Sequence, residues 1–576
     1  MTLSTNIKFE NNKTYYIAMG GSSEIGRNMY LIGHNNKWII MDLGVSFNKE
    51  FGIEITMADI SFLDDKEVVA ILITHGHEDH IGAIPYLIDQ FNAPIYATKF
   101  TADLILEKIA DQQKLSHHNV DVRVVKQGEK FILADTFEIE YIAITHSILE
   151  SSMILVKTPT VGFLNTGDWK FDPEPGTGAV SDVVRLKQLG DEKQVDYLLC
   201  DSTNVVSEKA SGSEKEVAYG LEQILKNFSG KRIFFTSFAS NIARIQSCIT
   251  AASRHKRTVF IEGKALKRMV GIAQKNGYLK SDDISPGSYE SFPLEKTFVI
   301  CTGCQGEPTA FLRRMIRNNK IQNGKDLVIF SSRAIPCNTQ DITDLKNLFI
   351  ERGADVLCSS DPTFFEEKEN IIGENDHQFK GAFFSVKDLK LHVSGHASSE
   401  EIYELLKLVR PGCLIPGYGD AYHMYYMEKL AKSVKQKFHN SGNGSVFQLE
   451  KGHIRMLGKI SVPIIGIDGN KLVDLNAGHI LQRKKLSTDG IAIVTIPKRT
   501  AQGINLKNLK FTVLGLAYNT DMINEIIKRI KKFVSYMVSQ PSRTGEDNDA
   551  HELQQFLSST LLELTGKNPT VVVHQN

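Results

Sequence analysis

Residues 75–80, with the sequence HGHEDH, place three histidines and an aspartate within six positions. Imidazole nitrogen and carboxylate oxygen are the ligands that Zn²⁺ prefers when one coordination position must stay open for water. A single histidine is more often an ordinary core or surface residue, but His75, His77, Asp79 and His80 occur together, which favours a metal-binding loop. The predicted chemistry is therefore hydrolytic.

Short apolar runs must position this loop. Residues 68–74 are predicted to form a buried strand that leads into it, and residues 81–86 are predicted to begin a helix after it. Three further predicted strands carry a carboxylate or histidine at or near their ends: 38–44 with Asp42, 141–147 with His146, and 161–168 with Asp168. Because strand ends are rigid, we predict that His146 and Asp168 are metal ligands and that Asp42 orients a histidine.

Length and composition set the wider expectations. The 576 residues exceed what one hydrophobic core normally serves, so several domains are expected. Lysine plus arginine equals aspartate plus glutamate at 67 each, so the net charge does not indicate binding to nucleic acid. A locally basic channel is still compatible with a neutral chain. The seven cysteines are scattered, which favours reduced thiols. The chain lacks the pattern of a signal peptide or a membrane span, so a cytoplasmic protein without membrane association is expected.

The candidate residues carry a resemblance. Four signals in chain order resemble motifs one to four of the metallo-β-lactamase superfamily: Asp42, residues 75–80, His146 and Asp168. Residues 199–204 and 391–397 resemble motifs A and B of its β-CASP branch, which comprises nucleic-acid nucleases. Within that branch, four more segments resemble the ribonuclease J family: residues 20–29, 303–308, 330–336 and 565–569. The resemblance extends over nearly the full chain.

The resemblance implies an α/β fold, in which an αββα metallo-β-lactamase sandwich holds an inserted β-CASP domain and is followed by a small C-terminal α/β domain. The implied boundaries are 1–205 and 385–457 for the metallo-β-lactamase domain, 206–384 for the β-CASP domain, 458–468 for a linker, and 469–576 for the C-terminal domain. Residues 521–538 are predicted to form an amphipathic helix. In this family the C-terminal domain supports self-association, which implies a homodimer or homotetramer.

The implied function is a metal-dependent ribonuclease that hydrolyses RNA phosphodiesters in RNA decay and maturation, as a 5′-to-3′ exonuclease with endonuclease activity. The family implies two zinc ions about 3.5 to 4 Å apart. The implied ligands are His75, His77 and His146 for one ion, Asp79 and His80 for the other, and Asp168 as a bridge. Mn²⁺ and Mg²⁺ are alternatives to zinc.

The resemblance also implies residues that act on the substrate. The catalytic residues would be Asp79, Asp201 and His396, with His396 as a proton donor or oxyanion stabiliser at the scissile phosphate. The implied RNA contacts are His392, Val393, Ser394, Gly395 and His396, together with Ser240 and Asn241 as donors to the 5′ phosphate. A phosphate pocket at a fixed distance from the metals would set the position at which an exonuclease cleaves relative to the 5′ end.

The chain departs from the family at motif C. There the family has a histidine that completes the ligands of the second metal, and this chain has Tyr418. Tyrosine is a poor zinc ligand unless it is ionised, which its ordinary pKa near 10 resists, so the second metal is predicted to bind more weakly. Three outcomes are open: Tyr418 coordinates as a phenolate, Asp420 or His423 substitutes, or the second site stays empty at ordinary zinc concentrations.

This departure leaves an alternative function open. Loss of one ligand is compatible with a catalytically impaired family member that binds RNA or scaffolds an active partner, whereas retention of the other six ligands favours an enzyme. Hydrolysis of small esters or lactams is a third hypothesis from the wider superfamily. The inserted domain and the loop at residues 392–396 speak against it.

Overall fold

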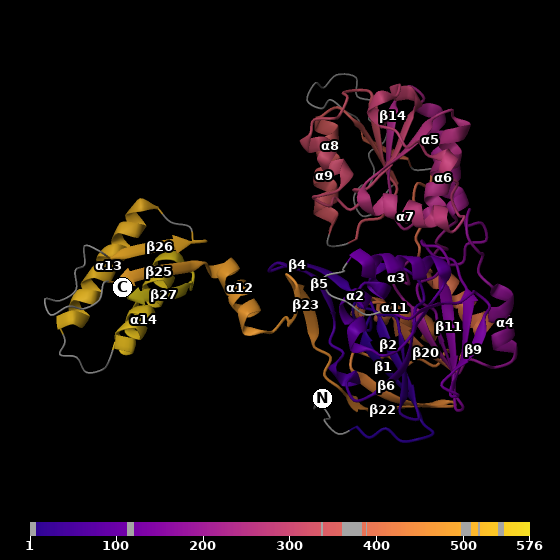
Figure 1. Cartoon of the computed structure of the whole chain (residues 1–576), viewed down its shortest axis with the longest axis horizontal. Coiled ribbons are helices and arrows are strands. Elements are labelled where there is room, and N and C mark those ends of the chain that lie inside the picture. The colour runs from indigo at the N-terminus through magenta and orange to yellow at the C-terminus, as the bar shows by residue number, and fades with distance from the viewer. Residues whose placement is uncertain are drawn as a thin grey trace. The chain divides into compact units, whose positions relative to one another are not determined.

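The computed structural model describes residues 7–111, 120–335, 338–359, 383–386, 389–496, 509–516, 519–539 and 546–575. These residues form two compact units (Figure 1). The larger comprises Met1–Ser46 with Met57–Val462, and the smaller comprises Phe47–Thr56 with Pro463–Asn576. Among the residues described, no helix combines the length and the apolar character that a membrane crossing needs.

The part of the larger unit that is expected to form the metallo-β-lactamase domain contains two mixed sheets. The first has the strand order β22-β21-β1-β2-β3-β6-β7-β8, and the second has the order β20-β13-β12-β11-β10-β9. The strands of the first sheet are β1 Thr14–Gly20, β2 Met29–His34, β3 Lys37–Met41, β6 Glu67–Leu72, β7 Ile95–Ala97, β8 Val122–Val124, β21 Ser445–Glu450 and β22 His453–Lys459. Those of the second are β9 Lys130–Leu133, β10 Phe137–Ala143, β11 Ser152–Lys157, β12 Gly162–Asn165, β13 Tyr197–Asp201 and β20 Cys413–Gly417.

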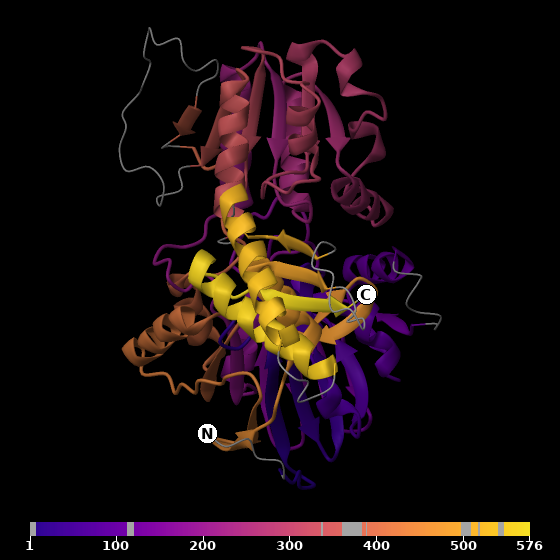
Figure 2. The ribbon, with the colours of Figure 1, turned by 90° about the vertical axis from the view of Figure 1, so that its left-hand side faces the viewer.

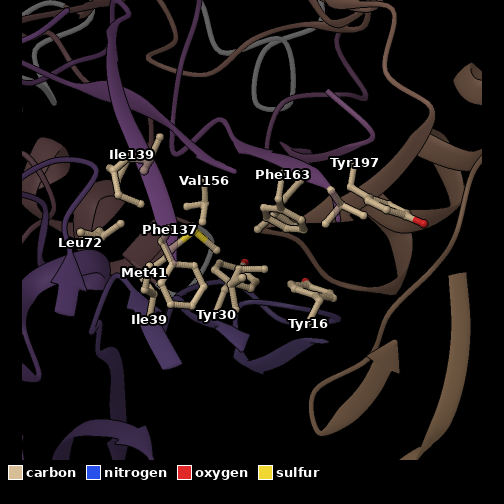
Figure 3. Packing of buried hydrophobic residues seen from close by; sticks show 14 of the residues in the cluster. Tyr16, Tyr30, Ile39, Met41, Leu72, Phe137, Ile139, Val156, Phe163 and Tyr197 are labelled. Atoms are coloured by element: carbon tan, nitrogen blue, oxygen red, sulfur yellow. The ribbon is translucent and has the colours of Figure 1, made fainter. Parts of the chain in front are cut away.

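One hydrophobic core joins the facing sides of these two sheets. Tyr30, Ile39 and Leu72 come from the first sheet, and Ile139 and Phe163 from the second, and all five pack in the same cluster (Figure 3). Strands β1, β2 and β12 are buried along their whole length, which explains why they appear in the sequence as continuous apolar runs and not as alternating ones. This core fixes the strand ends from which the candidate ligands emerge.

Helices cover the outer face of the second sheet. A second core joins Leu155 and Leu198 of the sheet to Leu186, Ile402 and Met427 of three helices. These helices are α4 Val183–Asp191, α10 Ser399–Val409 and α11 Ala421–Ser433. The predicted helix after the metal-binding loop is divided into α1 Glu78–Ile81 and α2 Ile84–Leu87, and α3 Lys99–Asp111 follows.

The inserted part contains a six-stranded sheet of order β15-β16-β14-β17-β18-β19, in which every neighbouring pair is parallel. Its strands are β14 Arg232–Thr236, β15 Thr258–Glu262, β16 Thr297–Cys301, β17 Asp326–Phe330, β18 Asp355–Ser359 and β19 Phe383–Val386. Its helices are α5 Glu214–Asn227, α6 Ile242–Arg254, α7 Lys264–Lys275, α8 Phe311–Arg317 and α9 Thr339–Glu351. Helices α8 and α9 lie on one side of β14, and α5 and α6 on the other (Figures 1 and 2). A parallel sheet buried between helices is typical of right-handed βαβ connections.

The smaller unit contains two further sheets. One has the order β24-β23-β5-β4, built from β4 Ser46–Glu50, β5 Ile53–Ala58, β23 Ile464–Asp468 and β24 Lys471–Asp474. The other has the order β26-β25-β27, from β25 Ile491–Ile496, β26 Lys510–Leu514 and β27 Thr570–Gln575. Helix α12 Gly478–Asp489 precedes β25, while α13 Thr520–Ser539 and α14 Glu546–Thr565 share one core with this sheet. The predicted amphipathic helix at 521–538 is confirmed as α13.

Two segments differ from the implied domain layout. The segment expected as a linker, 458–468, contains the end of β22 and the whole of β23. The segment 47–56, expected in the first domain, belongs to the smaller unit, where Gly466 of β23 approaches Ile53 of β5. The reason is that the isoleucine-rich runs of β5 and β23 need a sheet partner and find it in each other.

Candidate metal centre

Asp42, His75, His146 and Asp168 lie on loops within three residues of four strand ends, whereas Asp79 and His80 lie in helix α1. Strands β3, β6, β10 and β12 end before Asp42, His75, His146 and Asp168 respectively. The loops turn sharply, with φ of 61° at Asp42 and 55° at Gly167. Aspartate and glycine tolerate this left-handed region better than most residues. The turns bring four segments that are distant in sequence to one place.

The first ligand cluster comprises His75, His77, His146 and Asp168, whose candidate ligand atoms all lie within 4.8 Å of one another. His77 Nδ1 is 3.1 Å from both His75 Nε2 and His146 Nε2, and Asp168 Oδ2 is 3.6 Å from His75 Nε2. An ion about 2.0 to 2.2 Å from its ligands holds neighbouring ligand atoms roughly 3.0 to 3.6 Å apart. The spacing of this cluster fits one bound ion.

Each histidine of the first cluster is oriented through its other ring nitrogen. His75 Nδ1 is 3.0 Å from Thr74 Oγ1, His77 Nε2 is 2.9 Å from Ser240 Oγ, and His146 Nδ1 is 2.6 Å from the carbonyl oxygen of Gly395. Such contacts fix the tautomer and leave the lone pair of the inward nitrogen free for a metal.

Burial keeps these three imidazoles neutral. It lowers the pKa of His75 and of His146 well below 6.5, and neighbouring histidines lower both further. Burial likewise lowers the pKa of His77 to about 4. Neutral imidazoles are the form that binds metals.

The second ligand cluster comprises Asp79, His80 and Asp168. His80 Nε2 is 3.3 Å from Asp168 Oδ2 and 3.6 Å from Asp79 Oδ2, and His80 Nδ1 is 2.8 Å from Asp42 Oδ2. Burial opposes a charge on His80, but the three carboxylates outweigh it and raise the pKa of this histidine well above 6.5. Two buried carboxylates, those of Asp42 and Asp168, and the 36% exposed carboxylate of Asp79 surround one imidazole, which favours a cation here. Because Asp168 belongs to both clusters, it is placed to bridge two ions.

Asn28 also contacts the second cluster, and sequence reasoning gave it no role. Its side-chain Nδ2 lies 3.0 Å from His80 Nε2 and 3.2 Å from Asp79 Oδ2, and its backbone N–H donates to the carbonyl oxygen of Asp79. Thr74 was missed as well; its hydroxyl donates to Asp42 and faces His75. The signal was available, since Asn28 lies in the family-like segment 20–29 and Thr74 directly precedes the histidine loop.

His396 and Asp201 adjoin both clusters. His396 Nδ1 is 2.8 Å from Asp201 Oδ2 and 4.0 Å from Asp168 Oδ2. Burial opposes a charge on His396, yet the carboxylates of Asp201 and Asp168 raise its pKa to about 9. The His396 side chain keeps 27% of its surface exposed, so it is accessible to a substrate.

The other residues expected to contact RNA have diverse surroundings. Ser240 reaches the metal cluster through His77. The side chain of Asn241 instead caps α6 by accepting from the N–H of Arg244, and it donates to Glu214 while 3% exposed, so its amide is engaged inside the protein. Val393 is buried, whereas Ser394 accepts from the backbone N–H of His396. Arg244 donates to His392 Nδ1.

Tyr418 is buried beside the second cluster. Its hydroxyl donates to Asn165 Oδ1 at 2.6 Å, and its ring stacks on His80 with the centroids 5.7 Å apart. Burial raises the pKa of Tyr418 well above 10, and the neighbouring Tyr30 and carboxylates raise it further. The phenol is therefore neutral and engaged elsewhere, which argues against phenolate coordination.

The two other substitutes for the motif C histidine pair with each other. His423 Nδ1 lies 2.7 Å from Asp420 Oδ1, and Asp420 also caps the start of α11. Neither belongs to a ligand cluster among the residues that the structure describes.

This fold and these clusters define a protein of the metallo-β-lactamase superfamily with a β-CASP insertion. Residues 23–186 match the metallo-beta-lactamase superfamily, and residues 230–349 match the beta-CASP domain of ribonuclease J. The chain belongs to the ribonuclease J family. It is 32% identical to ribonuclease J of Sinorhizobium meliloti (84% of this chain, 83% of that one) and 33% identical to ribonuclease J 1 of Streptococcus pyogenes (86% and 85%).

A further relative supports the family assignment, and a solved structure supports the fold alone. Ribonuclease J of Mycoplasma pneumoniae is 30% identical and covers 96% of this chain and 95% of its own length. A crystal structure of a protein of unknown function from Enterococcus faecalis shares the fold, with a TM-score of 0.52, 14% identity, and coverage of 76% of this chain and 100% of its own. The predicted family and fold class are confirmed.

Proposed function

We propose that this chain is a metal-dependent ribonuclease that hydrolyses RNA phosphodiesters, proceeding from the 5′ end and also cutting internally, in RNA decay and maturation. The observation that carries the proposal is the position of His396, which is held by Asp201 at the edge of two ligand clusters that share Asp168. Membership in the ribonuclease J family supports RNA as the substrate.

His75, His77 and His146 would hold one metal ion, Asp79 and His80 the other, and Asp168 both. When bound, the two ions supply Lewis-acid activation of water and of the phosphate. Zinc suits the histidine-rich cluster, and Mn²⁺ or Mg²⁺ suits oxygen ligands. Asp42 and Thr74 keep the histidines in the required orientation.

His396 is the proposed proton donor. Because its Nδ1–H is engaged by Asp201, the Nε2–H is directed away from that carboxylate and is available to a phosphate oxygen. Asp201 stabilises the positive charge on the ring. This arrangement lets His396 donate a proton to the leaving oxygen of the RNA. His396 then takes up a new proton from water.

Ser240 and His392 are the proposed contacts to RNA phosphates. The Ser240 oxygen accepts from His77 Nε2, which leaves its hydroxyl hydrogen free to donate. His392 accepts from Arg244 at Nδ1, and burial together with Arg244 lowers its pKa well below 6.5, so Nε2 carries the remaining N–H. Both donors can bind a phosphate without a net charge on the side chain.

The proposal extends to self-association through the C-terminal domain. The apolar side chains of Leu514, Tyr536 and Leu562 in that domain are exposed and so are available for contact with another copy. Light scattering on the full chain tests this extension: a dimer or tetramer supports it, and a monomer at micromolar concentration contradicts it.

The test of the activity uses 5′-monophosphate and 5′-triphosphate RNA with the purified chain, with and without Zn²⁺ or Mn²⁺. We expect metal-dependent cleavage, faster on the 5′-monophosphate. Binding of RNA without cleavage under any metal would instead favour a scaffold. The Asp182→Asn variant serves as a control that is expected to cleave RNA as the parent chain does. Asparagine caps helix α4 as well as aspartate does, and residue 182 contacts no ligand.

A further inference from the structure

The second ligand cluster lacks the histidine that its family has at position 418, and the proposed substitutes are engaged elsewhere. The Tyr418 hydroxyl is bound to Asn165, and His423 is paired with Asp420. The cluster itself supplies one ligand atom each from Asp79, His80 and Asp168. A further protein ligand would come from another side chain that already touches these atoms.

Asn28 is the side chain in that position. It is 1% exposed, and its amide lies 3.0 Å from His80 Nε2 and 3.2 Å from Asp79 Oδ2. These separations fall within the range of roughly 3.0 to 3.6 Å expected between ligands of one ion. The backbone also fixes Asn28 there, because its N–H donates to Asp79 and its carbonyl oxygen accepts from Gly44.

Two features of the Asn28 amide favour a rotation of this group when a cation is bound. His80 Nδ1 faces the Asp42 carboxylate and so carries the ring hydrogen when a cation is bound, which leaves the lone pair of Nε2 to that cation. Once a cation takes this lone pair, the Asn28 N–H that now faces it has no acceptor there. Asn28 Oδ1, by contrast, is buried without a hydrogen-bond partner among the described residues. Turning the amide by 180° exchanges Nδ2 and Oδ1 and directs the oxygen at the cation.

We propose that the side-chain oxygen of Asn28 is a ligand of the second metal site, in place of the histidine absent at position 418, and that the site thereby prefers Mn²⁺ to Zn²⁺. Its ligands are then three oxygens, from Asp79, Asp168 and Asn28, with the single nitrogen of His80. Carboxylate and carbonyl oxygens suit manganese and magnesium, whereas imidazoles suit zinc. The inference rests on the proposed function, since it assumes that the two clusters bind metal.

The test measures metal binding and not activity. Metal-free full-length protein receives one equivalent of Zn²⁺ and is then titrated with Mn²⁺, with bound manganese counted by electron paramagnetic resonance. The parent chain is expected to bind one Mn²⁺. Asn28→Ala is expected to weaken that binding at least about 10- to 100-fold, the scale seen when groups around a metal are removed. Asn28→Asp, which keeps an oxygen at the same place and nearly the same shape, is expected to bind as tightly as the parent or more tightly.

Asn443→Ala is the matched control. Asn443 contacts Ser22 and Glu24 in the same loop between β1 and β2, but it contacts no ligand atom, so parent-like binding is expected. Retention of the first Zn²⁺ in each variant shows that the fold is intact.

Three results would overturn the inference: a parent chain that binds no Mn²⁺, an Asn28→Ala variant that binds it unchanged, or an Asn28→Asp variant as weak as Asn28→Ala. The last result would mean that Asn28 acts only as a hydrogen-bond donor to Asp79. The carboxylate of the Asn28→Asp variant cannot donate this hydrogen bond, and it repels the carboxylate of Asp79. Manganese binding as expected without cleavage of RNA by the parent chain would reject the proposed function and leave this ligand assignment standing.

Discussion

The two ligand clusters share Asp168 and differ in almost everything else. The first is built from three histidines, each oriented by a neutral partner or a backbone carbonyl, and burial lowers their pKa values. The second has one histidine and two carboxylates, and these carboxylates together with Asp42 raise the pKa of His80. We therefore expect the centre to hold two ions of different preference, because neutral imidazoles suit one kind of ion and carboxylates suit another.

Removal of the shared ligand should have the largest effect. Asp168→Ala is expected to weaken both sites and to lower RNA cleavage at least about 1000-fold, because metal activation contributes several kcal/mol to such reactions. Metal analysis by mass spectrometry and cleavage kinetics measure this. If Asp168→Ala lost only one ion, the clusters would be independent and the bridge would be rejected.

Loss of the proton donor should slow the cleavage step and leave metal binding at both sites unchanged. His396→Gln is expected to lower kcat by about 100- to 10,000-fold, the usual contribution of general acid catalysis, with the metal content unchanged. Single-turnover cleavage of RNA separates this step from binding. A variant with parental kcat would remove His396 from the mechanism.

Replacement of the carboxylate that orients His80 should lower metal affinity at the second cluster more than at the first. Asp42→Asn is expected to weaken the second site by roughly 10- to 100-fold and the first site less, because Asp42 contacts His80 directly and His75 only through Thr74. Ser240→Ala is the corresponding variant for the first site, because Ser240 contacts the ligand His77. Calorimetric metal titrations compare them, and equal losses at both sites in Asp42→Asn would contradict the division.

Restoring the family histidine should make the second cluster resemble the first. Tyr418→His is expected to raise the zinc bound per chain, because an imidazole adds a nitrogen ligand to an oxygen-rich site. Equilibrium dialysis against Zn²⁺ measures this. An unchanged zinc content would mean that residue 418 does not face the second ion.

The smallest effect is expected from Tyr418→Phe. Loss of the hydrogen bond to Asn165 should lower the free energy of unfolding by about 0.5 to 1.5 kcal/mol and leave the metal content unchanged. Urea unfolding with metal analysis checks both quantities. A loss of bound metal would show that the Tyr418 oxygen is a ligand after all.

The sequence predicted the family and fold class because its signals are local and specific. The residues of the histidine loop, His146 and Asp168 stand in fixed motif positions, and the structure brings their side chains together. Asn241 shows the limit of this reasoning: its motif position suggests substrate binding, but its side chain caps α6, which depends on where that helix begins. The family-like segment 20–29 marks Asn28, but the sequence does not predict its contact with His80, which joins residues 52 positions apart. The pairing of β5 with β23 escaped prediction for the same reason.

The most direct test is a crystal structure of the protein loaded with Zn²⁺ and Mn²⁺, with anomalous diffraction recorded at both absorption edges. We expect zinc among His75, His77 and His146, and manganese among Asp79, His80 and Asp168 with Asn28 Oδ1 as a ligand. A single ion, or zinc at both positions with the Asn28 oxygen turned away, would contradict this expectation.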